Sequence, residues 1–284
     1  MAEQDTSLKT RIERFYSAGP AAVNDSGAMH AFVELRDSLE SGKIRAAEPD
    51  AASPTGWKVN AWVKQGILLG FRLGVMREMG GDEFGFIDKH TFPMRRFSVD
   101  DGVRIVPGGS SVRSGAYLAK GVICAPPMFV NVGGYVDEAT MIDSHALVGS
   151  CAQIGKRVHL SAASQVGGVL EPVNASPVVL EDDVLVGGNC GVYEGTIVRK
   201  KAVLAAGTIL TRGTPVYDVV KGEVLRATSE MPLIIPEGAV VVPGSRAVSK
   251  GKGAQWDLSV YTPIIVKYRD EKTELSLVLE DLLR

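Results

Sequence analysis

Apolar residues recur at every sixth position through the middle of the chain. From Val106 onward, eleven successive positions at this spacing are apolar, and ten of them are valine, isoleucine or leucine. They are Val106, Val112, Leu118, Cys124, Val130, Val136, Ile142, Val148, Ile154, Leu160 and Val166. A period of six fits neither an α-helix, with about 3.6 residues per turn, nor a strand whose side chains alternate at two. It is typical of short parallel strands joined by tight turns, in which each side of a three-sided coil points one aliphatic side chain inward.

The six-residue rhythm changes phase twice, and turn-forming residues fill the gaps. The later runs are Leu180, Val186, Val192, Val198, Leu204, Leu210 and Val216, then Ile235, Val241 and, weakly, Ala247. The 32 glycines and the aromatic content of only 6 % suit tight corners around a narrow interior, because glycine adopts left-handed conformations without steric cost. We therefore predict a mainly β fold, a hexapeptide β-helix over residues 102–253 with outward loops near 170–179 and 217–234.

The chain before the repeat has a different pattern. Apolar residues three and four positions apart predict amphipathic helices at 12–16, 29–39 and 62–73, since this spacing places side chains on one helix face. Short extended pieces are expected between the third helix and the first coil. Together these elements predict a small α/β N-terminal domain over residues 1–101.

The chain after the repeat predicts a cap. Residues 261–268 form a strand-like run, and residues 273–283 favour a short helix. The open end of a β-helix exposes backbone groups that invite pairing with other strands. We therefore expect a C-terminal strand and helix over residues 254–284 to cover that end.

Charge and cysteine content exclude several classes of partner. The formal net charge is −2, without a run of five like charges, so neither nucleic acid nor a membrane surface is expected as a partner. No apolar stretch is long enough to span a membrane, and the first residues lack the apolar core of a signal peptide. Three cysteines are too few for a disulfide framework, so we expect a reducing, cytoplasmic location.

Several motifs outside the six-residue rule give the chain a specific resemblance. They are GKIRAAE at 42–48, WKVNAWVK at 57–64, GVRIVP at 102–107, TMID at 140–143, GSCAQIG at 149–155, VHLS at 158–161 and GGVLEP at 167–172. With these motifs the chain resembles the tetrahydrodipicolinate N-succinyltransferases, from about residue 30 to its end. The resemblance implies a left-handed parallel β-helix and a homotrimer with active sites between subunits.

The resemblance also implies a reaction. A member of this family moves a succinyl group from succinyl-CoA to the amine of L-2-amino-6-oxopimelate, the ring-opened form of tetrahydrodipicolinate, in lysine and diaminopimelate biosynthesis. Succinyl-CoA would act as a co-substrate, and we expect neither a tightly bound cofactor nor a metal. The expected partners are therefore a small dicarboxylate amine, an acyl-CoA and further copies of the chain.

Two residues match the family's substrate site. Arg104 corresponds to the substrate-binding arginine, and a guanidinium can hold a carboxylate with two parallel hydrogen bonds. Asp143 follows the inward Ile142 and corresponds to the essential aspartate. It is expected to bind the substrate and to accept a proton from the attacking amine or to orient it.

Four residues are candidates for contact with the coenzyme. Gly168, Asn189 and Gly207 fall where the family lets pantetheine run close to the backbone, and Lys250 is a candidate for the coenzyme phosphates. Glycine permits such a close approach because it has no side chain.

The chain departs from the family pattern at one position. Many members carry a second acidic residue three positions before a Glu-Gly pair, but here that position is Gly191. Three interpretations stay open: Glu194 takes the catalytic role from nearby, Asp143 works with a single carboxylate, or the chain represents a variant branch.

Rival functions were weighed on the same residues. The first is an acetyl-CoA-dependent N- or O-acetyltransferase acting on another small amine or a sugar nucleotide, with His159 as the base; His145 is the other histidine of the repeat. A zinc hydratase of the same fold needs three clustered histidines, but only these two of the four lie in the repeat. The last rival is a scaffold without catalysis.

Overall fold

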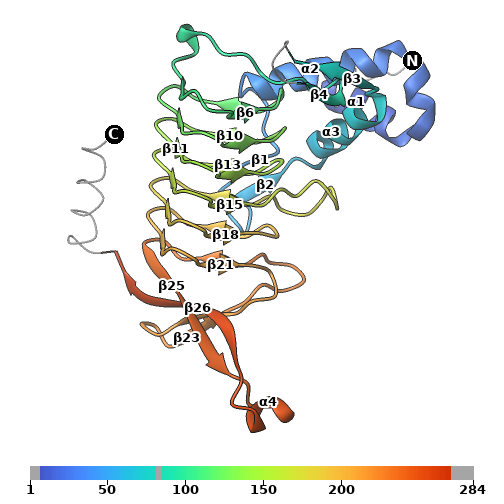
Figure 1. Ribbon diagram of the computed structural model, residues 1–284. Coiled ribbons are helices and arrows are strands. Elements are labelled where there is room, and N and C mark those ends of the chain that lie inside the picture. The colour runs from blue at the N-terminus through green and yellow to red at the C-terminus, as the bar shows by residue number, and fades with distance from the viewer. Residues whose placement is uncertain (1–6, 81–84, 270–284) are drawn as a thin grey trace.

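A three-sided coil of very short strands forms the body of the molecule (Figure 1). The computed structural model describes residues 7–80 and 85–269. Face I of the coil consists of β5 (Arg104–Ile105), β8 (Ile123–Cys124), β11 (Met141–Ile142), β14 (His159–Leu160), β17 (Leu185–Val186) and β20 (Val203–Leu204). Face II consists of β6 (Ser111–Val112), β9 (Phe129–Val130), β12 (Leu147–Val148), β15 (Gln165–Val166), β18 (Gly191–Val192) and β21 (Ile209–Leu210). Face III consists of β7 (Tyr117–Leu118), β10 (Tyr135–Val136), β13 (Gln153–Ile154), β16 (Val179–Leu180), β19 (Ile197–Val198) and β24 (Ile234–Ile235).

All pairs within these three rows of strands are parallel, and one apolar residue per strand points inward. On face II, for example, Val148 pairs with Val130 on one side and Val166 on the other, and all three side chains are fully buried. Removing such side chains from water drives the coil to form, at roughly 25 cal/mol per Å² of apolar surface. The prediction of a mainly β hexapeptide fold is confirmed.

The chain turns at three corners, called I–II, II–III and III–I after the faces that they join. At corner I–II, the residues His145, Ala163, Asn189 and Gly207 lie one turn apart and have φ angles of 62°, 59°, 56° and 78°. The backbone N–H of Asn189 donates to the carbonyl of Ala162 at 3.0 Å, which ties one corner to the previous one. Left-handed conformations cost energy for residues other than glycine, so these hydrogen bonds hold the corners in place.

The six-residue rhythm was assigned wrongly at its two ends. The inward residue of the first strand is Ile105, which pairs with Cys124 and packs against the core, so Val106 is not the first inward position. Seven residues separate Ile105 from the next inward residue, Val112, instead of six. At the other end Ala247 is exposed near the end of a long strand, so the inward run ends at Val241.

Charged side chains of alternating sign cover corner III–I. From turn to turn they are Lys120, then Asp137 and Glu138, then Lys156 and Arg157, then Glu181, Asp182 and Asp183, then Arg199, Lys200 and Lys201, and finally Glu237. Ion pairs join successive turns: Lys156 to Glu138 at 2.9 Å, Arg157 to Asp183 at 2.7 Å, Arg199 to Glu181 at 2.6 Å and Lys200 to Glu237 at 3.6 Å.

Three helices lie at corner II–III, at the end of the coil where it begins (Figure 1). They are α1 (Leu8–Ser17), α2 (Ser26–Glu40) and α3 (Ala61–Leu73), with a 3-10 turn, η1 (Gly19–Asn24), between the first two. Ile12, Phe32 and Ile67 are buried in one cluster with Val132 and Cys151 from the corner. The three helices thus appear where the sequence pattern predicts them.

Two hairpins accompany the helices. The first pairs β1 (Ala47–Pro49) with β2 (Trp57–Val59), and the second pairs β3 (Met76–Met79) with β4 (Phe86–Lys89). A further 3-10 turn, η2 (Val99–Asp101), precedes the first coil.

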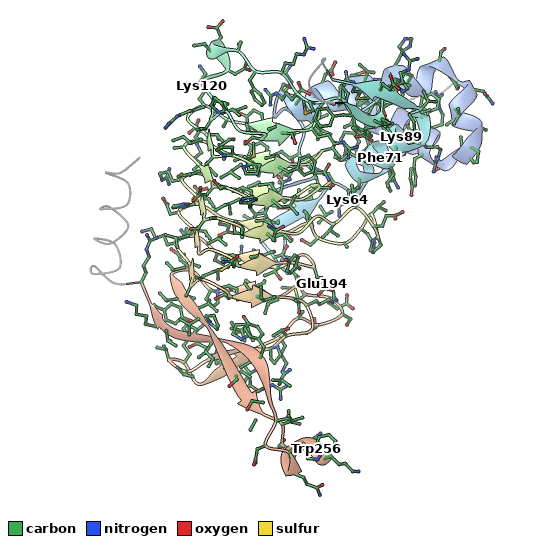
Figure 2. All side chains as sticks on the ribbon, viewed as in Figure 1. Lys64, Phe71, Lys89, Lys120, Glu194 and Trp256 are labelled. Carbon is green, nitrogen blue, oxygen red and sulfur yellow. The ribbon has the colours of Figure 1, made fainter. Side chains whose placement is uncertain are left out.

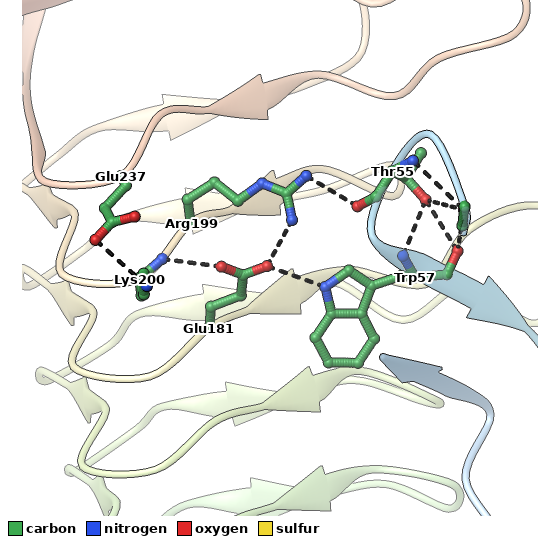
Figure 3. Close-up of polar contacts among 7 residues, drawn as sticks. Thr55, Trp57, Glu181, Arg199, Lys200 and Glu237 are labelled. Carbon is green, nitrogen blue, oxygen red and sulfur yellow. Dashed lines mark hydrogen bonds and ion pairs between the residues drawn. The ribbon is translucent and has the colours of Figure 1, made fainter. Parts of the chain in front are cut away.

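The β1–β2 hairpin and its turn are fastened to corner III–I through a half-buried polar cluster (Figure 3). Trp57 Nε1 and Arg199 both donate to Glu181 Oε1, at 3.1 and 2.6 Å. Arg199 also donates to the carbonyl of Thr55 at 2.9 Å. Arg45 lies 3.7 Å from the ring centroid of Tyr135. These contacts connect the chain before the repeat to the middle turns of the coil.

A long hairpin extends the coil at its other end (Figure 1). It pairs β25 (Ala239–Ala247) with β26 (Ser259–Tyr268) and carries a short helix, α4 (Lys252–Gln255), near its tip. β22 (Val216–Asp218) and β23 (Glu223–Leu225) extend the sheet of face I beside β26. The helix predicted at 273–283 lies outside the described residues. None of the helices in the described part of the chain is long and apolar enough to cross a membrane.

Candidate active site

Asp143 lies at corner I–II, directly after β11. Its Oδ1 accepts a hydrogen bond from the backbone N–H of Ser144 at 2.7 Å, and its own N–H donates to the carbonyl of Leu160 at 2.9 Å. The first bond holds the carboxylate through Oδ1 and the second ties the backbone to the next turn of the coil, so neither uses Oδ2. Oδ2 accepts no hydrogen bond from any residue in 7–80 or 85–269.

Asn189 and Gly207 lie on the same corner as Asp143, further along the coil. The N–H of Gly207 donates to the carbonyl of Gly188 at 2.9 Å, which continues the ladder of corner hydrogen bonds. Asn189 is exposed, and its left-handed backbone suits asparagine better than most residues. Along the coil axis, corner I–II therefore presents the carboxylate of Asp143, then the amide side chain of Asn189, then the backbone of Gly207, which no side chain covers.

Gly168 and Glu194 lie at corner II–III instead, where they line a cavity of about 690 Å³. The cavity is bounded by Thr55, Val59, Gly167, Gly168, Val169, Glu171, Pro172, Asn174, Ala175, Ser176, Tyr193, Glu194, Gly195, Arg212, Ser229, Glu230, Met231 and Pro232. Its walls thus come from the β1–β2 hairpin, the loop after β15, the turns after β18 and β21, and the loop between β23 and β24. A pocket of this size is large enough for a small-molecule ligand.

Glu194 is held in place by the cavity wall. Its φ is 54°, and its Oε2 accepts a hydrogen bond from the N–H of Arg212 at 2.8 Å. The guanidinium of Arg212 in turn donates to the carbonyls of Thr228 and Ser229. Glu194 therefore positions two of the loops that bound the cavity and also presents a carboxylate to it.

Gly168 has a structural reason to be glycine. A Cβ at this position would lie 2.5 Å from the backbone N of Ser150, and one at Gly149 would lie 2.2 Å from the N of Gly168. Backbone packs directly on backbone here, which only glycine allows. Contact of Gly168 with a coenzyme stays a prediction.

Arg104 and Lys250 lie apart from both corners. Arg104 starts β5 in the first turn of the coil and is exposed on face I. Lys250 is exposed between β25 and α4, on the hairpin that extends past the other end. Figure 2 shows Trp256, a neighbour of α4, far from Glu194 along the coil. A single chain therefore does not bring the predicted site residues together.

Lys64 is a residue near the cavity whose importance the sequence reasoning missed. It lies in α3 with no exposed surface, and its Nζ donates to the carbonyl of Ala175 at 2.5 Å. Burial lowers the pKa of Lys64, partly offset by the nearby Cys151. Figure 2 shows Lys64 and Glu194 on the side of the coil that carries the helices. Its position in the WKVNAWVK motif was the only sequence signal.

The cysteines lack the character of nucleophiles. All three are free and buried, and burial raises the pKa of Cys124 and of Cys151 to about 12. The thiol is the inert form, because the thiolate is the nucleophile. Cys190 is likewise buried, and its pKa is raised by burial.

The two histidines of the coil have different surroundings. His145 is exposed at corner I–II, whereas His159 lies in β14 and is 7 % exposed. Within residues 7–80 and 85–269, no three histidine, cysteine or acidic side chains are grouped so as to hold a metal ion.

Comparison with known proteins identifies the family. Residues 7–73 match a model described as "Tetrahydrodipicolinate N-succinyltransferase N-terminal", and residues 177–212 match "Hexapeptide repeat of succinyl-transferase". Proteins named 2,3,4,5-tetrahydropyridine-2,6-dicarboxylate N-succinyltransferase from Afipia carboxidovorans and Bradyrhizobium diazoefficiens are 40 % and 43 % identical to the chain. The alignments cover 99 % and 98 % of this chain, and 98 % and 99 % of those proteins. A protein of the same name from Sodalis glossinidius is 37 % identical over 100 % of this chain and 99 % of its own length.

The chain belongs to the tetrahydrodipicolinate N-succinyltransferase family. The resemblance drawn from the motifs is thus confirmed. The family model over 7–73 covers all three helices and the β1–β2 hairpin, so these elements belong to the family and are not an unrelated appendage.

The structure shows what fills the space beside Gly191, the position at which an acid was expected from the sequence. A Cβ on Gly191 would lie 2.4 Å from Cε2 of Tyr193 and 2.9 Å from its hydroxyl oxygen. The Tyr193 ring thus lies where a side chain at 191 would begin. Sequence reasoning treated the glycine as a missing acid and overlooked the tyrosine two positions later.

Proposed function

We propose that this chain catalyses succinyl transfer from succinyl-CoA to the amine of L-2-amino-6-oxopimelate in lysine and diaminopimelate biosynthesis. The observation that carries the proposal is identity of about 40 % over nearly the whole length of relatives that bear the succinyltransferase name. The acetyltransferase alternative is not favoured, because these relatives share one name. Succinyl-CoA is a co-substrate, and the mechanism needs no resident cofactor.

The transfer forms one bond and breaks another. The amine nitrogen attacks the thioester carbonyl carbon, and negative charge develops on the carbonyl oxygen. The C–S bond then breaks, the coenzyme leaves as a thiolate, and the nitrogen loses a proton to a base while the thiolate gains one. A carboxylate within hydrogen-bonding reach of the amine can orient it and accept that proton.

Asp143 is the residue that we assign to the amine. Its backbone N–H is held by Leu160 and its Oδ1 by Ser144, so Oδ2 is available to accept a hydrogen bond from a ligand. We assign Arg104 to binding a carboxylate of the substrate. Glu194 is assigned as the second catalytic carboxylate of the site, beside Asp143. The coenzyme is assigned to Gly168, Asn189, Gly207 and Lys250.

These assignments need two copies of the chain. Asp143, Asn189 and Gly207 lie at corner I–II, and Gly168 and Glu194 at corner II–III, so face II separates the two groups. We propose a homotrimer in which corner I–II of one subunit lies against face II and the cavity of the next. Closed symmetric assemblies repeat the same contact at every interface.

Mixing two inactive variants tests this arrangement. Asp143→Asn and Glu194→Gln are each expected to be inactive alone, but co-refolded subunits should recover about one quarter of the native activity, since one site in four then has both native residues. Recovery would support a site shared between subunits. Mixtures as inactive as their parents would place both residues in the same subunit's site.

The finer features of the fold and its setting are part of the same proposal. We assign the coil a left-handed sense, which the match of residues 177–212 to the hexapeptide repeat of succinyl-transferase supports. We also retain domain boundaries at 101 and 253, and a cytoplasmic location, for which the three free cysteines are the support.

A thiol-release assay tests the reaction itself. Purified protein, succinyl-CoA and tetrahydrodipicolinate should release free coenzyme A thiol, whereas acetyl-CoA should give much slower release. Fast turnover with acetyl-CoA and none with succinyl-CoA would overturn the donor assignment.

A further inference from the structure

Tyr193 has an unusual setting on face II. Its ring lies over two glycines: a Cβ on Gly191 would be 2.4 Å from Cε2, and a Cβ on Gly167 would be 2.7 Å from Cδ1. Neither glycine has a positive φ, so turn geometry does not require glycine at these places. Glycine in a strand often marks the close approach of another group, and here that group is the tyrosine ring.

The two glycines fix the direction of the phenol group. The hydroxyl oxygen lies 2.9 Å from where the Cβ of Gly191 would be, so the side chain runs back along β18. Gly191 is the β18 residue that follows corner I–II, whereas Glu194 lies at corner II–III. The hydroxyl therefore extends from the cavity at one corner toward the other corner, the one that carries Asp143.

The hydroxyl is available to a ligand. Tyr193 lines the cavity beside Glu194 and Arg212 and is half-buried. Its side chain makes no hydrogen bond to any residue in the described ranges: only its backbone is used, the N–H donating to the carbonyl of Leu210 and the carbonyl accepting from Thr196. The hydroxyl is not one of the buried polar atoms that lack a partner, so a ligand can reach it, and a ring held between backbone and cavity is ordered before any ligand arrives.

We propose that the Tyr193 hydroxyl binds the ligand by donating a hydrogen bond to one of its oxygens. This inference rests on the proposed function, which supplies two sources of such an oxygen: a carboxylate of the amine substrate, or the carbonyl of the acyl group. A phenol is a good donor to both. Gly191 is then the residue that makes room for this donor.

Tyr193→Phe removes the hydroxyl and keeps the ring. It should lower kcat/KM by about 10-fold or more, the expected effect of losing one hydrogen bond to a charged or developing-charge oxygen. A rise in KM for the amine substrate would identify the carboxylate as the partner, and a fall in kcat would identify the acyl carbonyl. Tyr217→Phe, another half-buried tyrosine, is the control and should behave as the native protein.

Gly191→Ala tests the packing on which the inference depends. The added methyl must displace the Tyr193 ring, so this variant should also lose activity. Because both changes act on the same hydroxyl, combining them should cost little more than either alone. Gly85→Ala is the control, since a Cβ there would meet nothing within 4 Å.

Binding measurements separate this inference from the proposed reaction. Calorimetry with pimelate, a seven-carbon dicarboxylate, and with succinyl-CoA should show weaker binding of one probe by Tyr193→Phe than by the native protein. The inference is wrong if the variant keeps native kcat, KM and affinity for both probes, or if the native protein binds neither. Absence of native turnover with a clear difference in binding would overturn the reaction and leave Tyr193 as a ligand-binding residue.

Discussion

The Nζ of Lys64 lies 2.5 Å from the carbonyl oxygen of Ala175, and this contact joins helix α3 to the loop that forms one wall of the cavity. The lysine has no exposed surface. Apart from this bond, the loop between β15 and β16 has few internal hydrogen bonds, among them that from the N–H of Ala175 to the carbonyl of Pro172.

Lys64→Met should separate activity from stability. The variant loses the anchor of the cavity wall, so kcat/KM should fall several-fold. Stability at neutral pH should change little, because removing a buried cation offsets the loss of its hydrogen bond. Enzyme assays and urea unfolding measure the two effects, with the exposed Lys58→Met as control. Equal losses of activity in both variants would contradict a role for this contact.

The same lysine predicts how stability depends on pH. Burial lowers the pKa of Lys64 below its usual 10.5, so between the lowered pKa and 10.5 the unfolded chain holds a proton that the folded chain lacks. The free energy of unfolding should therefore rise with pH through that window, as the cost of a buried charge disappears. Urea unfolding at stepwise higher pH should show this rise in the native protein and a flatter curve in Lys64→Met.

Asp143→Asn should lose activity without losing the fold. The amide oxygen can still accept the hydrogen bond from Ser144, but it cannot take a proton, so kcat should fall by roughly 100-fold or more. Asp137→Asn is a matched control, because Asp137 Oδ1 accepts the N–H of Glu138 at 2.8 Å in the same way at another corner. Similar losses in both variants would show that corner structure, not chemistry, is the cause.

Asp218 should make the protein sensitive to acid. Burial alone would raise the pKa of this carboxyl, but hydrogen bonds from the Tyr268 hydroxyl at 2.6 Å and from the N–H groups of Lys221 and Val220 hold it below the usual 3.8. Its contribution to stability is therefore complete above pH 3.8 and is lost as the pH falls through the lowered value.

Comparison of Asp218→Asn with the native protein checks this. The difference in urea midpoint between the two should be largest near neutral pH and should shrink in acid. A difference that stays constant down to the lowest pH at which the native protein is folded would mean that the ionised carboxylate does not matter.

Glu181 should contribute more to stability than a surface acid of the same corner. Its carboxylate accepts from Trp57, Arg199 and the N–H of Lys200, so Glu181→Ala should cost about 1–3 kcal/mol by leaving donors without a partner. Glu138, whose carboxylate pairs with the exposed Lys156, should tolerate alanine with no clear change in the urea midpoint. The fluorescence of Trp57 should shift in the first variant only.

The repeat could be predicted because it depends on a local rule. Each inward residue follows from the six-residue phase, as Val130, Val148 and Val166 show. The inward residue of the first strand was assigned wrongly to Val106 because Ile105 and Val106 are both apolar. Their strand, β5, pairs with β8 alone, so the repeat extends in only one direction from it and does not distinguish the two residues. At Ala247 the chain has left the coil for the β25–β26 hairpin, which the rhythm cannot foresee.

The candidate site could be predicted only residue by residue. Asp143 was found from its motif, but its separation from Glu194 by face II depends on counting corners across the phase change after Val166. The cavity wall depends on a contact between Lys64 and Ala175, which are 111 positions apart in sequence. No periodic pattern encodes such a contact. Tyr193 was overlooked because its position depends on the packing of its ring against the backbone of Gly167 and Gly191, which the sequence pattern does not indicate.

The alternation of charge along corner III–I has a consequence for how the chain finds its fold. Successive turns of the coil are nearly identical in shape, so a nascent chain could skip a turn and still bury valines. A skipped turn would stack like charges, such as Lys156 and Arg157 against Arg199, where the native winding puts Asp183 beside Arg157 and Glu181 beside Arg199. The alternating charge at corner III–I therefore specifies which turns are neighbours. A coil with one turn skipped is destabilised by repulsion between like charges along this corner.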